Sequence, residues 1–432
     1  MLLKLAWRNL WRHRRRSLLT VAAIGLGLAV LIFMVSFIVG LEEMMVEQVA
    51  RSSAGHVQLH HPDYRARRSV ELVLPEASRL LAAVEATPGV RAASARLVFT
   101  GAVRSSLSSA VPVVQILAVD PEREGRFSIL ADHVTRGGFL VPPPEALAPD
   151  APARVKARKG ITLGVTLARS LKVDLGSKVR VETAGFRGAT TAAAFHVSGL
   201  IETGSDVIDG RLALVRLADM QELSGAGDAV HEISVLTEGA AAIPGAVEAL
   251  RATAAANHVA GTPPAEVLPW WEVAPDVGRM IDLLDLWSGI VYLLMLVVLS
   301  AGILTTMFTV VLERRHELGV LLALGERPSL LFVGVMLEAL LLALLAVAAG
   351  LMVGAVAVAW LVVYGLDLRW LIGGYSVAGL LVSAIYHGSW AARVFWQPAL
   401  VVFVGTVFMA LWPALRVARM KALDAIRQGG AK

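Results

Sequence analysis

Residues 312–330, with the sequence LERRHELGVLLALGERPSL, separate two long apolar runs at residues 286–312 and 330–364. Each run is long enough to cross a bilayer, because about 20 apolar residues that rise about 1.5 Å each span the hydrocarbon. The residues that open the stretch are polar and cannot lie in hydrocarbon: Glu313, Arg314, Arg315, His316 and Glu317. The stretch is therefore predicted to lie outside the bilayer, as the connection between two spans.

A short amphipathic helix is predicted within residues 313–328. Apolar residues recur there at helical spacing, at Leu318, Leu321, Leu322 and Leu324. Gly325 is expected to end this helix and Pro328 to open the next one. The arginine pair favours the cytoplasmic side, where membrane proteins accumulate Lys and Arg. Such a helix lies on lipid or docks into a partner, and an ordinary solvated turn between spans is the alternative.

The composition is typical of a membrane protein with a sizeable polar part. Of the 432 residues, 56% are hydrophobic, which exceeds the roughly 45–50% of soluble domains. The net charge is +5, and bases cluster at the N-terminus, at Lys4, Arg8, Arg12, Arg14, Arg15 and Arg16. With an apolar run following at once, this cluster indicates membrane topology and headgroup contact rather than nucleic-acid binding. Because the chain has no cysteine, disulfides, thiolate metal sites and cysteine lipidation are excluded.

The predicted fold class is an α-helical membrane protein with four transmembrane helices and an extracytoplasmic α+β domain inserted between spans one and two. The first apolar run is too long for a signal-peptide core and lacks a small-x-small cleavage site, so an uncleaved span is expected. The predicted segments are an amphipathic segment at 1–16, spans at 17–41, 283–312, 329–364 and 398–415, an extracytoplasmic domain at 42–282, a cytoplasmic helix at 313–328, an outer loop at 365–397 and a cytoplasmic tail at 416–432.

The α+β domain is predicted from alternating strand and helix patterns. Strands are expected at 90–103, 111–119, 178–183, 195–201, 212–215 and 232–236 from their β-branched residues. Helices are expected at 76–86, 163–171, 217–223 and 244–257, and a proline-rich loop at 141–153.

Aromatic and acidic residues flank the second span on its outer side. Trp270, Trp271 and Trp287 suit the outer membrane interface, with a ligand-stacking site as the alternative. Asp282 and Asp285 are interpreted as solvated flanking charges. Further along, the outer loop is expected to contain a re-entrant or interfacial piece around residues 377–385.

No catalytic residue and no metal site are predicted. The chain lacks a G-x-x-x-x-G-K-[ST] phosphate loop, and it contains neither G-x-S-x-G nor H-E-x-x-H. His56, His60, His61 and Asp63 are the one metal-like cluster. Because His60 and His61 are adjacent, they would point to opposite faces of a strand and leave too few ligands, so a solvated strand end is preferred.

Glu338 is the sole carboxylate inside the third span. An ionisable group at membrane depth is costly and is often functional. The alternatives are that Glu338 snorkels to the inner interface or takes an internal partner.

Residues 313–354 resemble the signature of FtsX-like ABC-transporter permeases, which carry E-x-G-x-L-x-A-L-G and then a span with an early Glu and a later Gly. The matching positions are Glu317, Gly319, Leu321, Ala323, Leu324, Gly325, Glu338 and Gly350. The resemblance implies that the short helix contacts a separate ATPase and that Glu338 has a conformational role. The implied coupling residues are Glu313, Arg314, Arg315, Glu317, Leu318, Gly319, Leu321, Leu322, Leu324 and Gly325.

The domain at 42–282 resembles the periplasmic domain of lipoprotein-releasing (LolC/LolE-like) permeases. The resemblance lies at residues 52–64, 160–185 and 197–225. This resemblance implies an inner-membrane permease subunit with both termini in the cytoplasm, which extracts lipoproteins. The implied partners are an ATPase dimer that binds ATP and magnesium, a second permease chain in a homodimer or heterodimer, membrane lipid and a periplasmic lipoprotein carrier. Two alternatives remain open: MacB-like efflux of a small molecule or peptide, and FtsX-like activation of a cell-wall hydrolase.

Overall fold

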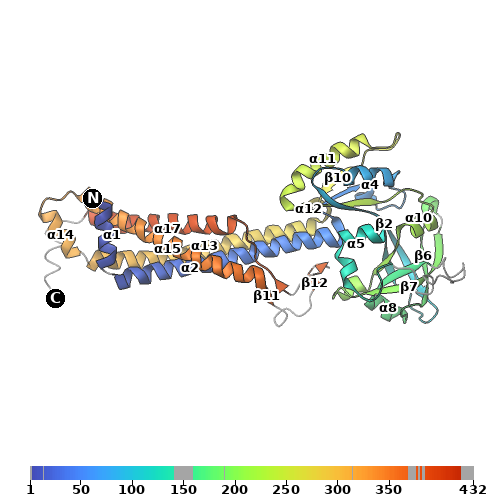
Figure 1. The fold of residues 1–432 in the computed structure, drawn as a ribbon, viewed down its shortest axis with the longest axis horizontal. Coiled ribbons are helices and arrows are strands. Elements are labelled where there is room, and N and C mark those ends of the chain that lie inside the picture. Colours follow the sequence, from blue (N-terminus) through green and yellow to red (C-terminus); the bar gives the residue numbers. More distant parts are fainter. Residues whose placement is uncertain are drawn as a thin grey trace. The chain divides into compact units, whose positions relative to one another are not determined.

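The computed structural model describes residues 2–12, 14–140, 159–188, 190–313, 315–367, 376–377, 380–381 and 385–419. Contacts divide the chain into two units (Figure 1), each described by itself below. The helical unit comprises Met1–Glu43, Ile281–Leu368 and Ile385–Lys432, and the sheet unit comprises Met44–Met280 and Arg369–Ala384. The predicted proline-rich loop at 141–153 lies outside the described residues.

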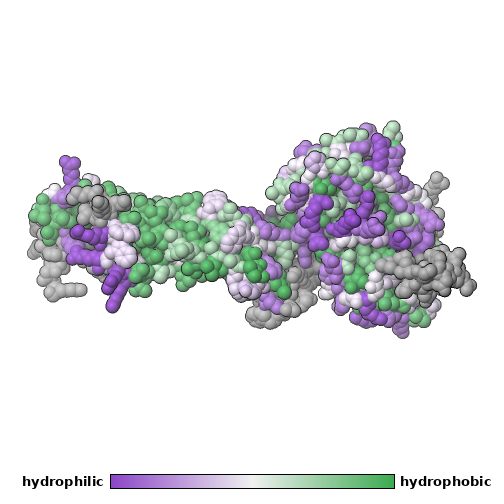
Figure 2. Space-filling model, viewed as in Figure 1, coloured by the Kyte–Doolittle hydropathy of each residue, from purple (hydrophilic) through white to green (hydrophobic). Residues whose placement is uncertain are grey.

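In its described part, the helical unit contains four long apolar helices and two short helices. They are α1 (Leu2–Arg12), α2 (Arg14–Val49), α13 (Pro275–Glu313), α14 (Arg315–Ala323), α15 (Pro328–Tyr364) and α17 (Arg393–Ala418). Among the described residues, four helical segments are long and apolar enough to cross a membrane: Ser17–Ser52, Pro275–Gly302, Pro328–Tyr364 and Arg393–Ala418. Figure 2 shows hydrophobic side chains spread over the visible surface of these helices. This is the surface expected of helices whose solvent is lipid.

Several helix ends differ from the sequence-based expectation. The first and second long helices extend beyond residues 17–41 and 283–312, because α2 continues to Val49 and α13 already begins at Pro275. The last helix begins at Arg393 rather than at Pro398, which lies inside α17. The Arg393 side chain pairs with Glu42 of α2 at 3.5 Å, and this contact supports the added first turn.

The predicted re-entrant piece around residues 377–385 is only partly described. The described residues there form two-residue strands, β12 (Ser376–Val377) and β13 (Leu380–Leu381), which pair with each other. A second short pair joins β11 (Leu366–Asp367) to β14 (Ile385–Tyr386). The described residues of this loop therefore form short strand pairs.

Close helix packing forms the core of the helical unit. Leu28 and Ile32 of α2 are fully buried against α15, and Val402 and Ala410 of α17 belong to the same cluster. A Cβ atom added at Gly350 of α15 would lie 2.8 Å from the Cβ of Leu28 and 2.8 Å from the carbonyl oxygen of Gly25. The backbones of α2 and α15 therefore approach each other at a position where only glycine fits.

The sheet unit is built on one large sheet. Its strands are β1 (Val57–His60), β2 (Val90–Ser105), β3 (Val113–Val119), β4 (Val134–Gly137), β5 (Gly160–Gly164), β6 (Lys178–Ala184), β7 (Thr190–Ile201), β8 (Leu212–Arg216), β9 (Glu232–Thr237) and β10 (Glu266–Pro269). The strand order is β10-β1-β9-β2-β3-β8-β5-β7-β4, and β6 pairs with both β2 and β7. Neighbours are antiparallel except for the parallel pairs β3–β8 and β5–β7.

Helices and irregular turns cover this sheet. The helices are α3 (Tyr64–Arg67), α4 (Ala77–Glu85), α5 (Pro121–Phe127), α8 (Val165–Leu171), α9 (Asp206–Asp209), α10 (Leu217–Ser224), α11 (Ile243–Ala256) and α12 (Trp270–Val273). The turns are short helical segments of other types: the π-helix η1 (Ala50–Ala54) and the 3-10 helices η2 (Ile129–His133), η3 (Phe186–Gly188) and η4 (Ala240–Ala242). Along β2, Ala93, Ala95, Leu97 and Phe99 alternate with Ser94, Arg96 and Val98, so successive side chains serve opposite faces of the sheet.

The strand predictions are largely confirmed, with one clear error. The six predicted strands correspond to β2, β3, β6, β7, β8 and β9. The predicted helix at 163–171 is wrong in its first two residues, because β5 runs to Gly164 and α8 follows it. Ile161 and Leu163 are buried between β7 and β8. Pairing with these strands makes this stretch a strand, because it is too short to show a hydrophobic period of its own.

Trp270 differs from the interfacial role expected for it. Its side chain is buried in the sheet unit, and the backbone N–H of Trp270 donates to the backbone carbonyl of His56 at 3.0 Å. The pairing of β10 with β1 brings Trp270 to the sheet and away from any exposed position. Trp271 and Trp287 are exposed, as an interfacial role requires.

We expect Gly350→Val to destabilise the helical unit, because the added carbons would meet backbone and side-chain atoms of α2. Overpacking of this kind costs about 1–3 kcal/mol. Gly334→Val is the matched control, since Gly334 lies on the same helix with nothing within 4 Å of a Cβ atom. The measurement is the apparent melting temperature of the purified full chain, and equal melting temperatures for both variants would contradict the packing argument.

Candidate functional site

The end of α14 is set by a tight glycine turn. Gly325 has φ +90°, and its N–H donates to the carbonyl of Leu322 at 3.1 Å. The N–H of Glu326 donates to the carbonyl of Leu321 at 3.0 Å, which completes a Schellman motif. Pro328 then occupies the first turn of α15. The predicted roles of Gly325 and Pro328 are both confirmed.

One side of α14 packs against its own chain. Leu318 is 6% exposed and forms a cluster with Leu331 and Val335 of α15 and Ala414 and Val417 of α17. Leu322 packs against the same cluster and Gly319 is buried. The structure therefore differs from the expectation that Leu318 and Leu322 belong to a face offered to a partner. The short helix α14 is fastened to two of the long helices.

The opposite side of α14 carries an exposed stripe, here called the α14 stripe: Glu317, Val320, Leu321 and Leu324. These positions follow the i, i+3, i+4, i+7 spacing of one helix face. Leu324 is 79% exposed and Leu321 is 40% exposed. An apolar stripe of this size on a short helix is a surface that a partner or lipid covers.

The charged positions beside the stripe are only partly described. α13 ends at Glu313 and α14 begins at Arg315, while Arg314 lies outside the described residues. Glu317 lies 3.8 Å from the guanidinium of Arg12 on α1, and both side chains are largely exposed. An exposed pair of this kind contributes little to stability, so Glu317 remains accessible to a partner.

Glu338 lies on α15 beside Ala339, which is fully buried, and three residues after Val335. The Glu338 side chain is half-buried and interacts with another group of the protein. The internal partner and snorkelling to the inner interface both stay predictions.

A polar cluster that the sequence-based reasoning missed joins α2, α13 and α17. The Glu42 side chain is 12% exposed and lies 3.5 Å from Arg393 of α17. Asp285 of α13 is in hydrogen-bonding contact with Glu42, so it is not the isolated solvated charge that was expected. Ser389 donates to Glu43 at 2.9 Å beside this cluster. The signal was the Glu42-Glu43 pair at the end of an apolar run, whose partners lie far away in the sequence.

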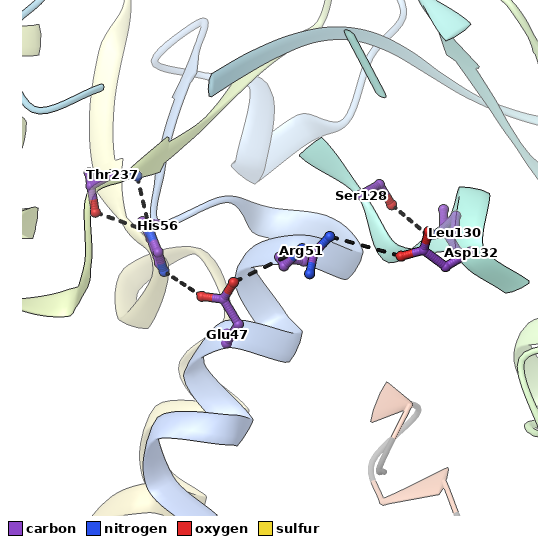
Figure 3. A network of polar contacts seen from close by, with 7 residues as sticks. All are labelled: Glu47, Arg51, His56, Ser128, Leu130, Asp132 and Thr237. Atoms are coloured by element: carbon purple, nitrogen blue, oxygen red, sulfur yellow. Dashed lines mark hydrogen bonds and ion pairs between the residues drawn. The ribbon is translucent and has the colours of Figure 1, made fainter. Parts of the chain in front are cut away.

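A second polar network lies in the sheet unit, where α2 ends and β1 begins (Figure 3). The imidazole of His56 lies 3.6 Å from the carboxylate of Glu47 and accepts from the N–H of Thr237 at 3.1 Å. The guanidinium of Arg51 lies 4.0 Å from Glu47 and 4.0 Å from Asp132 of η2. The last turns of α2 are thereby connected to β9 and to η2.

The four residues of the metal-like cluster do not converge. His56 belongs to the network just described, and His60 faces Glu266 of β10 at 3.7 Å. His61 accepts from the N–H of Asp63 at 3.2 Å. Within the described ranges, no group of three or more His, Asp or Glu side chains has an arrangement suited to a metal ion.

A buried charge cluster occupies the polar face of β2. Arg96 and Glu124 of α5 are both fully buried, and the Arg96 Nε donates to Glu124 at 3.2 Å. Ser94 donates to the same carboxylate, and the Arg96 guanidinium lies 4.8 Å from the ring centre of Phe127. Glu232 of β9 lies 4.0 Å from Arg96, and burial raises the pKa of its carboxyl to about 7 despite that arginine.

Two protein families match the chain. Residues 17–253 match the family described as "MacB-like periplasmic core domain", and residues 289–422 match "FtsX-like permease C-terminal". A comparison with curated proteins found no match.

Three solved structures similar to the chain are an extracellular domain, a periplasmic region and a permease domain. The extracellular domain of the noncanonic ABC-type transporter YknZ from Gram-positive bacteria is 15% identical, with 49% of this chain and 98% of that chain covered and a TM-score of 0.33. The periplasmic region of MacB from Actinobacillus actinomycetemcomitans is 11% identical, with 51% and 91% covered and a TM-score of 0.32. A domain of a putative permease protein from Porphyromonas gingivalis is 16% identical, with 51% and 91% covered and a TM-score of 0.30.

We expect the stability of the sheet unit to depend on pH through Glu232. Because its folded pKa of about 7 exceeds the ordinary 4.5, the unfolded chain releases this proton first as the pH rises, and the fold loses stability between these values. Glu232→Gln cannot ionise, so the stability of this variant relative to wild type should increase from about pH 5 to about pH 8. The increase in the free energy of unfolding is at most about 3 kcal/mol, and it is measured as a rise in the apparent melting temperature. The exposed Glu238→Gln serves as control, and a Glu232→Gln curve parallel to wild type would refute the assignment.

Proposed function

The chain belongs to the FtsX/MacB type of ABC-transporter permeases, and from this membership we propose that it couples a separate ATPase to movement of its extracytoplasmic domain. In this proposal the partner ATPase dimer binds ATP and magnesium, because the chain has no phosphate loop. The Arg-rich N-terminus and the basic C-terminal end support cytoplasmic termini in a bacterial inner membrane, with the sheet unit outside.

The observation that carries the proposal is the construction of α14. Its exposed stripe offers apolar area to a docking partner, while Leu318 fastens the other side to α15 and α17. The Schellman turn at Gly325 leaves little freedom between α14 and α15. A displacement of α14 by the ATPase would therefore move these long helices with it. Glu338, half-buried on α15, lies on this route and is proposed to change its interactions as the helices move.

Two continuous helices support transmission towards the extracytoplasmic side. α2 has 36 residues and α13 has 39, which correspond to about 54 Å and about 58 Å at about 1.5 Å per residue. Both exceed the hydrocarbon thickness of about 30 Å. The boundaries between the helical unit and the sheet unit, at residues 43/44 and 280/281, fall inside these two helices.

A second permease chain is proposed as a partner because α13 is poorly covered by its own chain. Only 6% of its most apolar window is buried, compared with 44%, 39% and 33% for the other three segments. Lipid or another helix must cover this surface, and four helices enclose little of a path by themselves. A homodimer and a heterodimer both fit this surface.

For the substrate, we propose a lipoprotein that is extracted from the inner membrane and passed to a periplasmic carrier. The support is the resemblance of residues 160–185 and 197–225 to lipoprotein-releasing permeases. Efflux of a small molecule or peptide, and activation of a cell-wall hydrolase, are the competing outcomes.

The substrate proposal is tested in proteoliposomes that contain the whole complex, an acylated lipoprotein and a soluble carrier. We expect ATP-dependent transfer of the acylated protein to the soluble fraction, and no transfer of a variant that lacks the acylated cysteine. Normal ATP hydrolysis without any transfer would overturn the lipoprotein assignment and leave the coupling proposal standing.

The coupling proposal predicts that Leu324→Glu or Leu321→Glu releases the ATPase while the chain still folds. Burial of a leucine at an interface contributes roughly 1.5–3 kcal/mol when complete, so each substitution should weaken ATPase binding by about tenfold or more. Leu107→Glu, a change at another exposed leucine in the sheet unit, is the matched control. Recovery of the ATPase in a pull-down is measured together with membrane insertion, and wild-type recovery for both α14 variants would refute docking at the α14 stripe.

A further inference from the structure

The sheet unit contains a cavity of about 350 Å³ on the polar face of its central strands. A volume of this size lies at the lower end of pockets that hold small molecules. The lining includes polar groups from three strands, namely Arg96 of β2, Gln115 of β3 and Glu232 of β9. It also includes the apolar side chains of Val98, Leu117, Leu130, Ile208 and Leu212. The lining is therefore amphipathic.

The charges that face the cavity are mostly positive. Arg96 is neutralised by Glu124, with which it shares a buried ion pair. Arg65 and Arg68, at the end of α3, add two further guanidinium groups to the lining. Glu232 also lines the cavity and is close enough to Arg68 for their charges to interact. Because burial raises the pKa of its carboxyl to about 7, it is only partly ionised at neutral pH. An anion would therefore be attracted to the Arg65–Arg68 end.

The cavity lies at the chain segments that continue into α2 and α13. Ser52 and Ala54 of η1 line it, and η1 directly follows α2. Val273 and Ala274 also line it, and α13 begins at the next residue. Arg65 donates to the carbonyl of Val273 at 3.1 Å, so one of the cavity arginines already holds the segment that leads into α13.

The ion pair between Arg51 and Asp132 connects two of the lining segments (Figure 3). Arg51 belongs to η1, which supplies Ser52, and Asp132 belongs to η2, which supplies Leu130. Two of the lining segments are thus linked by a contact of the protein itself, and segments that are linked before binding lose less entropy when a ligand binds.

We propose that this cavity binds a small amphipathic anion, with its charged group at Arg68 and Arg65 and its apolar body along Val98, Leu117 and Leu212. This inference goes beyond the proposed coupling function and does not depend on which substrate is moved. An occupant would touch the segments that continue into α2 and α13, so the site is placed to sense a ligand where both helices join the domain.

The cysteine-free chain allows a direct test with the full-length protein. In Ser52→Cys, a single thiol would lie in the cavity lining, and its reaction rate with the neutral reagent N-ethylmaleimide reports occupancy. Hexanoate is the probe, since it carries one carboxylate and a short apolar chain. Hexanol and hexylamine, of the same length, test whether the negative charge matters. Ser170→Cys, exposed on α8, tests for effects unrelated to the cavity.

We expect hexanoate to slow labelling of Ser52→Cys in a saturable manner, about fivefold or more, while hexanol and hexylamine do so only at concentrations about tenfold higher. Labelling of Ser170→Cys should not change. Equal protection by all three compounds, or none by hexanoate, would overturn the proposal. A rise in the apparent melting temperature of the wild-type chain with hexanoate provides a readout that needs no cysteine.

Arg68→Gln should raise the hexanoate concentration needed for half-protection by about tenfold, because a charge-assisted contact is lost. The matched control is Arg67→Gln, which removes the same charge at the neighbouring residue, the last of α3, which does not line the cavity. If the two substitutions have equal effects, hexanoate is attracted by the general surface charge and not by this site, and the proposal is overturned. No effect of Arg68→Gln would do the same.

Discussion

At Gly350 the backbone of α15 approaches α2 so closely that an added Cβ atom would lie 2.8 Å from a backbone oxygen. Apolar helices in lipid gain little from the hydrophobic effect, so their association depends on van der Waals contact of this kind. α15 also packs on α17 and, through Leu331 and Val335, holds α14. The position of the short helix therefore depends on the packing of the long ones.

The leucines of α14 fall into two groups, one packed against the same chain and one exposed. Leu318 is used internally, and Leu321 and Leu324 remain exposed. A helix that had to bury all its leucines in a partner would be loose when the partner is absent. Here Leu318 and Leu322 fix the helix to its own chain, and Leu321 and Leu324 are exposed, so in the proposed coupling a force applied at the exposed leucines would reach the long helices.

In the sheet unit, the constraint is the burial of charge. Arg96 and Glu124 are removed from water, and such ions are tolerated only when paired and hydrogen-bonded. The pair anchors α5 on the polar face of β2, next to a cavity that the apolar residues of β2 and β3 do not fill. This polar face differs from the opposite one, where Leu97 and Phe99 belong to a fully buried core.

The sequence alone determined the long apolar helices, the polar break at residues 313–328, the roles of Gly325 and Pro328, and most of the strands. These features depend on local composition, period and turn chemistry, which neighbouring residues specify. A G-x-x-x-G pattern at Gly350 and Gly354 was also present and would have indicated a close helix contact. Only the tertiary structure decided which leucines of α14 are exposed, that Trp270 is buried, and that Glu42 meets Asp285 and Arg393. It also decided that Arg96 pairs with Glu124 and that a cavity lies beside them, because these contacts join residues whose separation in the chain carries no local signal.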